Sequence, residues 1–379
     1  MDLYSKDDVL RLAEFIFVDC VKLDVGDCVI VEGIDVSSET LILFKKVALK
    51  FGFKPILLFK SNSILIENSN LEDESLVDLQ AKYELGLMRK AKAFIGLREP
   101  RNLYELGNLT DQARSITLNR FIRPVHFNYR NNKLQWLYFR LPTEVQFKRA
   151  SRRAQEKLVS SYFKSVFISP TVFSTAIDPL AKRLEGTKQV RILAKQTDIC
   201  FELSSTGVYK SVGSHNLPDG EIFVSPKRTG VNGVVNFNVP STYLGRYFEN
   251  IALTFECGKV VKMVADRDLN FLDQILDIDD GSRYCGELAL GLNPYIEAPI
   301  NDILYDEKMH GSFHLALGNS YPEADNGNRS TIHWDLIQDM KSTEAKVFFD
   351  DDLVMDCGKF VSDDLIGLNL DPLKNRLLR

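Results

Sequence analysis

Residues 28–59 have the sequence CVIVEGIDVSSETLILFKKVALKFGFKPILLF, and this stretch decides the fold of the first half of the chain. Cys28–Val31 is a short β-branched run, which predicts a buried strand. Ser37 or Ser38 can cap the helix that follows, because a serine hydroxyl accepts a bond from the free amides of a first helical turn. Lys54–Phe59 then predicts a second strand.

The same alternation of helix and strand continues on both sides of this stretch. Lys6–Asp19 carries apolar residues at helical spacing, and Ala91–Leu97 and Trp136–Leu141 predict further strands. Such alternation is typical of a mostly parallel sheet covered by helices. We therefore expect an α/β domain over residues 1–187. A nucleotide site is not expected, because neither a Gly-x-Gly-x-x-Gly segment after a strand nor a phosphate-binding Gly-Lys-Ser/Thr loop is present.

The second half changes to short β-branched runs separated by turns, so we expect a β-rich α+β catalytic domain over residues 188–379. A polar segment, Asp178–Lys188, is expected to connect the two halves. Two short helices are predicted over Asp268–Leu276 and Ser282–Leu290. The predicted strands are Val190–Leu193, Asp198–Leu203, Ile222–Ser225, Val234–Asn238, Ile251–Glu256, Val260–Ala265, Lys346–Phe349 and Leu353–Met355.

Composition limits the classes of partner. The 379 residues are 45% apolar and 26% charged, as in an ordinary soluble globular protein of two domains. The net charge of −5 argues against binding to nucleic acid or to an anionic membrane surface. A basic helical stretch over residues 144–164 contains Glu144 and Glu156 and has no aromatic stacking platform, which favours a solvated helix face. No apolar window is long enough to predict a membrane helix.

The cysteines indicate the compartment. None of the six forms a C-x-x-C pair, and the first residues show no secretory pattern. We expect reduced, mostly buried thiols in a cytoplasmic protein. The cysteines are Cys20, Cys28, Cys200, Cys257, Cys285 and Cys357.

Histidines gather in one part of the second half. Three of the five, His310, His314 and His333, fall within 24 residues, and imidazole is a common metal ligand. His333 and Asp335 stand two residues apart, a spacing that places both side chains on one face of a strand. This cluster predicts a metal site. The other two histidines, His126 and His215, are expected to be ordinary surface or turn residues.

Two carboxylates are candidates for the same site. Glu221 stands where a turn meets a strand, and Glu287 lies among apolar residues in a stretch that is helical by pattern. A carboxylate in an apolar stretch is costly unless a cation or a metal balances it. Arg283, four residues before Glu287, is one such cation, so both explanations stay open.

Four ordered motifs resemble the M29 family of metallo-aminopeptidases, the aminopeptidase T and aminopeptidase S type. The resemblance also includes Leu141-Pro-Thr143 and so spans nearly the whole chain. Four motifs in a fixed order are far more specific than any one of them. The motifs are Leu217-Pro-Asp-Gly-Glu221-Ile-Phe223, Arg283-Tyr-Cys-Gly-Glu287-Leu-Ala289, His314-Leu-Ala-Leu-Gly-Asn-Ser-Tyr321 and Ile332-His333-Trp-Asp335.

The resemblance implies a site for two divalent metal ions, zinc, cobalt or manganese. Carried over position by position, it gives Tyr321 a role as hydrogen-bond donor to a developing oxyanion. The chemistry of such a site also needs a carboxylate, Glu287 by preference or another of the set, as the base that takes a proton from water. The resemblance also implies short peptide substrates and a homodimer. The implied metal ligands are Glu221, Glu287, Glu307, His314, His333 and Asp335, with Asp306 as the alternative to Glu307.

Two further observations refine this expectation. A zinc-protease helix is not predicted at His310 and His314, because Gly311 stands where the glutamate of that motif belongs. His310 is therefore expected to be a bystander. The segment between Tyr321 and His333 is shorter than is usual in the family, and we expect it to border the site.

Three hypotheses of function follow. The leading one is a metal-dependent aminopeptidase that releases N-terminal amino acids from short peptides with a metal-activated water. The second is a catalytically silent relative that binds a peptide or a partner protein. The third keeps two metals but acts on another amide or ester.

Overall fold

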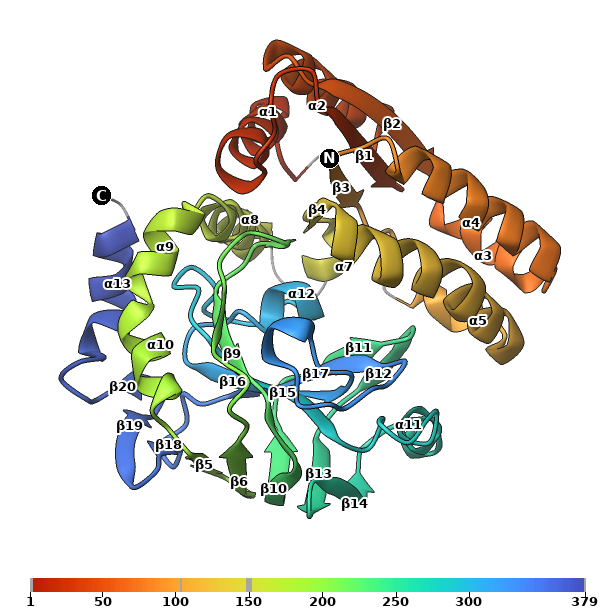
Figure 1. Ribbon diagram of the computed structural model, residues 1–379. Helices are drawn as coiled ribbons and strands as arrows, with labels where there is room; N and C mark the ends of the chain where they lie inside the picture. Colours follow the sequence, from red (N-terminus) through yellow and green to blue (C-terminus); the bar gives the residue numbers. More distant parts are fainter. Residues whose placement is uncertain (1–2, 103, 148–151, 378–379) are drawn as a thin grey trace. The chain divides into compact units, whose positions relative to one another are not determined.

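The chain forms two compact units. The structure is a computed structural model that describes residues 3–102, 104–147 and 152–377 (Figure 1). Unit 1 comprises residues 1–167 and 213–217, and unit 2 comprises residues 168–212 and 218–379. A domain boundary between residues 187 and 188 stays a prediction, which limited proteolysis would test.

Unit 1 is built on a five-stranded sheet in the order β2-β1-β3-β4-β8, in which every neighbouring pair is parallel. Val29, Ile30 and Val31 of the first strand are fully buried, so both faces of the sheet are covered. The α/β class expected for this region is confirmed. The strands are β1 (Cys28–Ile34), β2 (Lys54–Lys60), β3 (Ala93–Arg98), β4 (Gln135–Arg140) and β8 (Asn216–Leu217).

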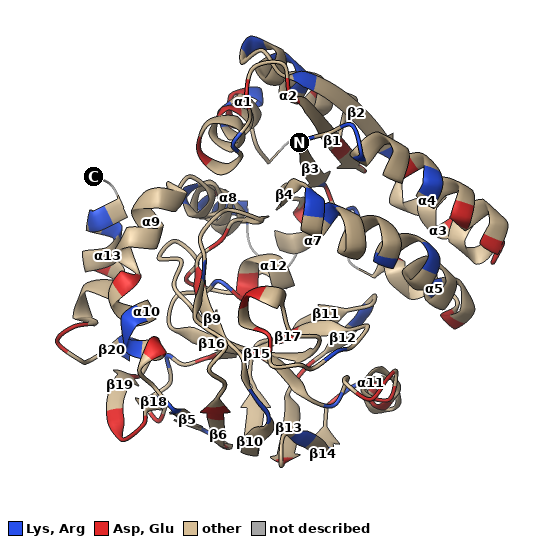
Figure 2. Ribbon diagram, viewed as in Figure 1, with Lys and Arg blue, Asp and Glu red and all other residues tan. Residues whose placement is uncertain are grey.

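Helices surround this sheet, and acidic and basic residues both occur along α4 and α5 (Figure 2). Ser37 caps α2 by accepting a hydrogen bond from the amide of Thr40. Residues 148–151 of the predicted basic helix lie outside the described residues. The helices are α1 (Lys6–Phe15), α2 (Ser38–Lys50), α3 (Asn62–Asn70), α4 (Glu74–Met88), α5 (Asp111–Thr117), α6 (Asn131–Lys133), α7 (Glu144–Phe147) and α8 (Arg152–Val166), with π-helical turns at Ile16–Cys20 and Leu118–Arg130.

The expectation for His126 was wrong. This histidine is 7% exposed, and its Nδ1 lies 3.2 Å from an Arg130 nitrogen. Burial, followed by the nearby Arg130 charge, lowers the pKa of His126 to about 3, so the ring is neutral. His215 is partly buried, and its ring stacks on Trp136 with centroids 4.4 Å apart.

A buried ion network ties together the first three strands of unit 1. The Glu32 side chain is 1% exposed, and its two oxygens lie 2.7 Å from Lys60 Nζ and 2.9 Å from an Arg98 nitrogen. Burial raises the pKa of Glu32, but the charges of Arg98 and Lys60 outweigh it and lower that pKa to about 2. Glu32 is therefore ionised and paired at neutral pH.

Unit 2 contains an eight-stranded sheet in the order β14-β13-β10-β6-β5-β18-β19-β20. Its paired strands are antiparallel, and the hairpin turn expected at Cys257-Gly258 joins β13 to β14. The strands are β5 (Gln189–Ala194), β6 (Thr197–Leu203), β10 (Pro226–Phe237), β13 (Ile251–Glu256), β14 (Lys259–Val264), β18 (Lys346–Phe349), β19 (Asp352–Asp356) and β20 (Lys359–Phe360).

A second, five-stranded antiparallel sheet has the order β17-β16-β15-β9-β7. The helix predicted over Ser282–Leu290 was wrong, because Cys285–Gly291 forms β15 in this sheet. All seven of its residues are buried, so its apolar run has no alternation to distinguish a strand from a helix. The other strands are β7 (Tyr209–Ser211), β9 (Glu221–Val224), β16 (Ser312–Gly318) and β17 (His333–Asp339), and a separate hairpin joins β11 (Ser241–Tyr243) to β12 (Arg246–Phe248).

Helices complete unit 2. Asp178–Lys188, expected to be a polar connection, contains α10, whose Leu180 and Leu184 are buried in the core of this unit. Along the described part of the chain, no helix has the length and apolar character needed to cross a bilayer. The helices are α9 (Pro170–Ala176), α10 (Asp178–Glu185), α11 (Leu269–Leu276), α12 (Ile303–Asp306) and α13 (Leu370–Leu377).

Candidate metal centre

Strand alternation in the five-stranded sheet separates its apolar residues from its candidate ligands. The residues that point to one face belong to the main hydrophobic core of unit 2, among them Ile222, Leu288, Leu315 and Trp334. The residues that alternate with them point to the other face. That second face carries Glu221 on β9, Glu287 on β15, His314 on β16, and His333 and Asp335 on β17.

Small residues lie opposite the candidate ligands in the neighbouring strands. In the strand register, Gly291 lies opposite Glu221 and Ala289 lies opposite His314. Ala316 on β16 pairs with Glu287 on one side and Asp335 on the other, and Gly318 pairs with His333. Each of these five residues thus faces a glycine or an alanine across the ladder, and at Gly291 and Gly318 the main-chain oxygens of Met309 and Ile332 take the place of a side chain.

Glu221, Glu287 and His314 form the centre of the cluster. One ligand atom from each lies within 4.8 Å of the others. His314 Nε2 is 3.3 Å from Glu221 Oε2 and 3.4 Å from Glu287 Oε1. All three are buried, and no described residue offers a hydrogen bond to Oε2 of Glu221 or of Glu287. These two oxygens have only imidazole nitrogens near them, at 3.3 Å and 3.7 Å, and buried carboxylate oxygens without a hydrogen bond are costly unless a cation balances them.

His333 and Asp335 join the cluster from β17. His333 Nε2 lies 3.4 Å from Asp335 Oδ1 and 3.7 Å from Glu287 Oε2. Nδ1 of His333 lies 2.8 Å from the main-chain oxygen of Asn319, to which it can donate. In the neutral ring this bond leaves the lone pair on Nε2, which faces the carboxylates, and that arrangement is usual for a metal-binding histidine.

Glu307 is also brought to the cluster, whereas Asp306 is not. Asp306 accepts hydrogen bonds from the amides of Ile300 and Asp302. Glu307 instead lies 2.7 Å from Lys308 Nζ, and the same ammonium is 2.5 Å from Glu221. The geometry therefore favours Glu307 over Asp306.

Lys308 is a residue of the centre that the sequence did not reveal. It is 1% exposed and lies among Asp219, Glu221 and Glu307. Burial lowers the pKa of Lys308, but Glu221 and Glu307 outweigh that effect and hold the pKa well above its ordinary value. A lysine directly after Glu307 gave no sign of burial, because lysines are almost always exposed.

Titration of the cluster reflects concentrated negative charge in a dry place. Burial raises the pKa of Glu221 to about 7 and that of Glu307 to about 8, even though Lys308 acts in the opposite direction. Burial acts in the opposite direction on His314 and His333 and lowers their pKa values. The surrounding carboxylates, which include Glu287 and Asp335, outweigh burial and raise the pKa of His314 to about 9 and that of His333 to about 10. The raised pKa values of Glu221 and Glu307 mean that burial disfavours their anionic forms, and a bound cation would offset that cost.

Tyr321 lies at the edge of the cluster. Its ring centroid is 4.5 Å from that of His333 and 6.1 Å from that of Phe223. The loop that follows it is fixed by amide side chains: Asn328 donates to the main-chain oxygens of Gly281 and Gly318. The short segment before His333 is therefore anchored at the border of the site.

Other residues considered from the sequence lie elsewhere. Arg283 pairs with Asp273 at 2.8 Å and Asp277 at 2.7 Å, so it is not the partner of Glu287. His310 Nε2 lies 2.8 Å from the main-chain oxygen of Leu368, away from the cluster. All six cysteines are free thiols, as expected, but the expectation that most are buried was wrong, because only Cys285 is buried.

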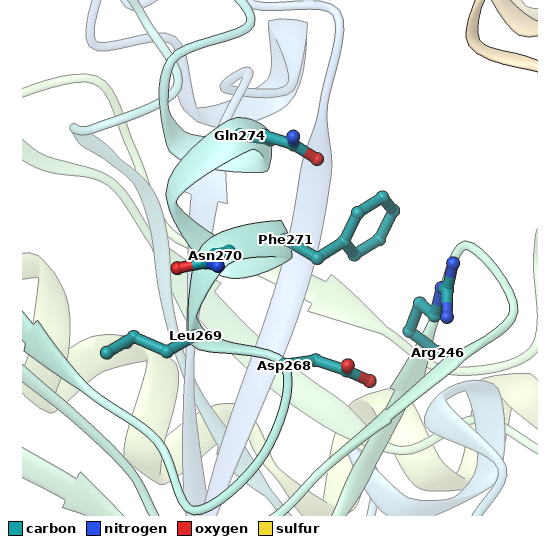
Figure 3. A pocket seen from close by; sticks show the side chains of 6 residues that line it. All are labelled: Arg246, Asp268, Leu269, Asn270, Phe271 and Gln274. Atoms are coloured by element: carbon teal, nitrogen blue, oxygen red, sulfur yellow. The ribbon is translucent and has the colours of Figure 1, made fainter.

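A hollow of about 440 Å³ opens elsewhere on unit 2, beside α11 (Figure 3). None of the candidate metal ligands lines it, and the ring of Phe271 points towards Arg246, whose guanidinium carbon is 5.3 Å from the ring centroid. The hollow is thus separate from the cluster. Its lining residues are Arg246, Asp268, Leu269, Asn270, Phe271 and Gln274.

Sequence comparison relates the chain to metallopeptidases. The family described as thermophilic metalloprotease (M29) matches residues 5–360. Aminopeptidase AmpS of Bacillus subtilis is 33% identical over 162 residues, which cover 38% of each chain. Aminopeptidase 2 of Geobacillus stearothermophilus is 38% identical over 114 residues, or 28% of this chain and 26% of the relative. These matches therefore span well under two thirds of the relatives' length.

Structural comparison shows the same fold in two solved proteins. Wild-type AmpT from Thermus thermophilus has a TM-score of 0.76 at 21% identity, and the match covers 94% of this chain and 100% of AmpT. A 2,5-dihydroxypyridine dioxygenase from Pseudomonas putida has a TM-score of 0.57 at 13% identity, covering 95% and 99%. Because this fold also occurs in a protein named as a dioxygenase, the shared fold alone does not select a function.

Proposed function

The chain belongs to the M29 family of metallopeptidases, and from this premise we propose that it is a metal-dependent aminopeptidase that releases N-terminal amino acids from short peptides. The observation that carries the proposal is the buried convergence of Glu221, Glu287 and His314, joined by His333 and Asp335, on one face of the five-stranded sheet. Carboxylate and imidazole groups without a thiolate suit divalent zinc, cobalt or manganese.

The residues present fit two ions. Glu221 Oε2 and Glu287 Oε2 are buried without a hydrogen-bond partner in the described residues, which is the condition that a bound cation relieves. The cluster contains five carboxylates, which can together carry five negative charges, and the one ammonium of Lys308. The difference of four charges matches two divalent ions. The carboxylates are those of Asp219, Glu221, Glu287, Glu307 and Asp335. The proposed ligands are Glu221, Glu287, Glu307, His314, His333 and Asp335, and the balancing groups are Asp219 and Lys308.

The chemistry divides among the residues of this face. Bound divalent ions supply Lewis acidity and lower the pKa of water. Glu287, at the middle of the cluster, takes the proton of the attacking water and gives it to the leaving amine. Tyr321, at the edge of the cluster, donates a hydrogen bond to the oxyanion that develops on the substrate carbonyl. The anionic cluster also attracts the free ammonium group of a peptide N-terminus.

Hydrolysis of peptides by chelator-treated protein tests the proposal. We expect activity on leucine p-nitroanilide and on dipeptides to return when zinc, cobalt or manganese is added, and to require a free N-terminus. His333→Ala should abolish it, and Glu256→Gln, an exposed carboxylate on β13 of the other sheet, should not.

The same assay decides between the remaining hypotheses. Folded protein that binds metal but cleaves only other amides or esters would favour the third hypothesis. Folded protein without metal or turnover would favour the silent relative. A homodimer and a cytoplasmic location are further parts of the proposal, and sedimentation and cell fractionation would test them.

A further inference from the structure

Lys308 sits on one side of the proposed metal centre. Its Nζ contacts Glu221 at 2.5 Å, Glu307 at 2.7 Å and Asp219 at 3.7 Å. The main chain holds it in place, because its amide donates to Tyr305 and its carbonyl oxygen accepts from Asn293. The side chain is 2% exposed, so the ammonium has little freedom to leave.

Among the described residues, the other side of the centre has no paired lysine or arginine. Glu287, His333 and Asp335 contact one another through His333 Nε2, and among the described residues none of the three forms an ion pair with Lys308. His314 lies between the two groups, 3.3 Å from Glu221 and 3.4 Å from Glu287. We call Glu221 and Glu307 the Lys308 side, and Glu287, His333 and Asp335 the His333 side.

The fixed positive charge of Lys308 changes how tightly each side can bind a divalent cation. The ammonium already balances part of the charge of Glu221 and Glu307, and it repels any dication that these carboxylates bind. On the His333 side, the groups that face the carboxylates are the imidazoles of His333 and His314, which are themselves proposed ligands and are neutral when they bind a metal ion, whereas Lys308 keeps its charge. The same protein face therefore offers two cation positions of unequal charge.

We propose that Lys308 is a resident cation that makes the two metal positions unequal: the His333 side binds the first ion tightly, and the Lys308 side binds the second ion weakly and exchangeably. This inference rests on the two-ion function proposed above. It predicts that the protein is isolated with one ion retained and the other readily lost.

Titration of Mn²⁺ into metal-free, full-length protein tests the inference, with the electron paramagnetic resonance signal of free Mn²⁺ as the readout. We expect two binding steps in the wild-type protein, the second at least about tenfold weaker. Lys308→Met should tighten the second step by about 10- to 100-fold and leave the first nearly unchanged, because the repulsive charge is removed. Lys308→Arg keeps the positive charge and should therefore keep the difference in affinity between the two binding steps.

Controls separate this effect from a general change of charge or stability. Lys262→Met removes an exposed charge on β14 of the other sheet and should leave both steps unchanged. If Lys308→Met does not fold, as judged by circular dichroism, Glu307→Gln takes its place and should weaken the second step alone.

Each outcome has a defined meaning. Two binding steps of equal affinity in the wild-type protein would overturn the inference and leave the proposed function standing. A difference in affinity that persists or widens in Lys308→Met would have the same meaning. Equal weakening of both steps by Glu307→Gln would overturn it too. Absence of any bound Mn²⁺, Zn²⁺ or Co²⁺ would overturn the proposed function, and this inference with it.

Discussion

Trp334 anchors the strand that carries two of the proposed ligands, and its replacement gives a prediction with a calculable size. It stands between His333 and Asp335 and points to the opposite face, where it is fully buried. Its indole Nε1 donates to Ser241 Oγ at 3.0 Å, and its ring stacks on Tyr243 with centroids 4.6 Å apart. The β11–β12 hairpin thereby holds β17 from behind.

Trp334→Phe should destabilise the protein by about 3 kcal/mol. The lost hydrogen bond contributes about 1 kcal/mol, reduced stacking about 0.5 kcal/mol, and the space left by the smaller ring about 1–2 kcal/mol. For a unit of this size, about 3 kcal/mol lowers the midpoint of thermal unfolding by roughly 6–12 °C. The ligands themselves are untouched, so metal binding at saturation should be retained.

Urea unfolding of a double-mutant cycle measures the effect. Ser241→Ala leaves the indole N–H buried without its acceptor and should cost about 1–3 kcal/mol. The double variant should cost about 1 kcal/mol less than the sum of the single variants, because both remove the same bond. In Trp334→Phe, Trp136 is the only tryptophan left, so its fluorescence reports unit 1 separately. Additive losses, or a loss below about 0.5 kcal/mol for Trp334→Phe, would refute this reasoning.

Three further predictions concern the site and the buried network. Glu287→Gln should reduce peptide hydrolysis by at least about 100-fold with the fold intact, because the proton carrier is lost; steady-state kinetics measures this, and a smaller loss would remove Glu287 from that role. Ala316→Leu should prevent full metal loading, since the larger side chain enters the space between Glu287 and Asp335; metal analysis checks it, and normal loading would contradict it. Glu32 has a folded pKa of about 2 against an ordinary 4.5, so its contribution of about 3 kcal/mol is complete above pH 4.5 and lost as the pH falls towards 2. Urea unfolding of wild-type protein and Glu32→Gln should therefore converge over that range, and a constant difference would speak against it.

The alternation in the sequence was sufficient to predict the layered architecture of unit 1. The β-branched run at Val29–Val31 can satisfy its burial only inside a covered sheet, and the predicted strand is present. The hairpin at Cys257-Gly258 also followed from local turn chemistry, since both residues have positive φ there.

Strands buried on both faces were harder to predict. Glu287 was placed on a helix because Cys285–Gly291 shows no polar alternation, although its side chain points into a polar cluster. His126 was judged a surface residue, since nothing in the local sequence shows that the ring of Phe94 on β3 packs against it, with centroids 6.3 Å apart. Both failures have one cause, because burial is set by elements distant in sequence.

The candidate site was predicted as a set of residues rather than as a geometry. The two-residue spacing of His333 and Asp335 correctly placed both on one face of a strand. That Glu307 rather than Asp306 turns to the cluster depends on the hydrogen bonds of Asp306 with main-chain amides after Pro299, and Lys308 enters only through the folded path of this loop. Neither is visible in spacing.

Anomalous X-ray scattering from crystals grown with Mn²⁺ tests the central claim most directly. Two peaks are predicted on the polar face of the five-stranded sheet, among Glu221, Glu287, Glu307, His314, His333 and Asp335, with the peak on the Lys308 side the weaker at limiting Mn²⁺. No peak on this face at saturating Mn²⁺, or peaks only elsewhere in the molecule, would contradict the assignment of this face as a metal centre.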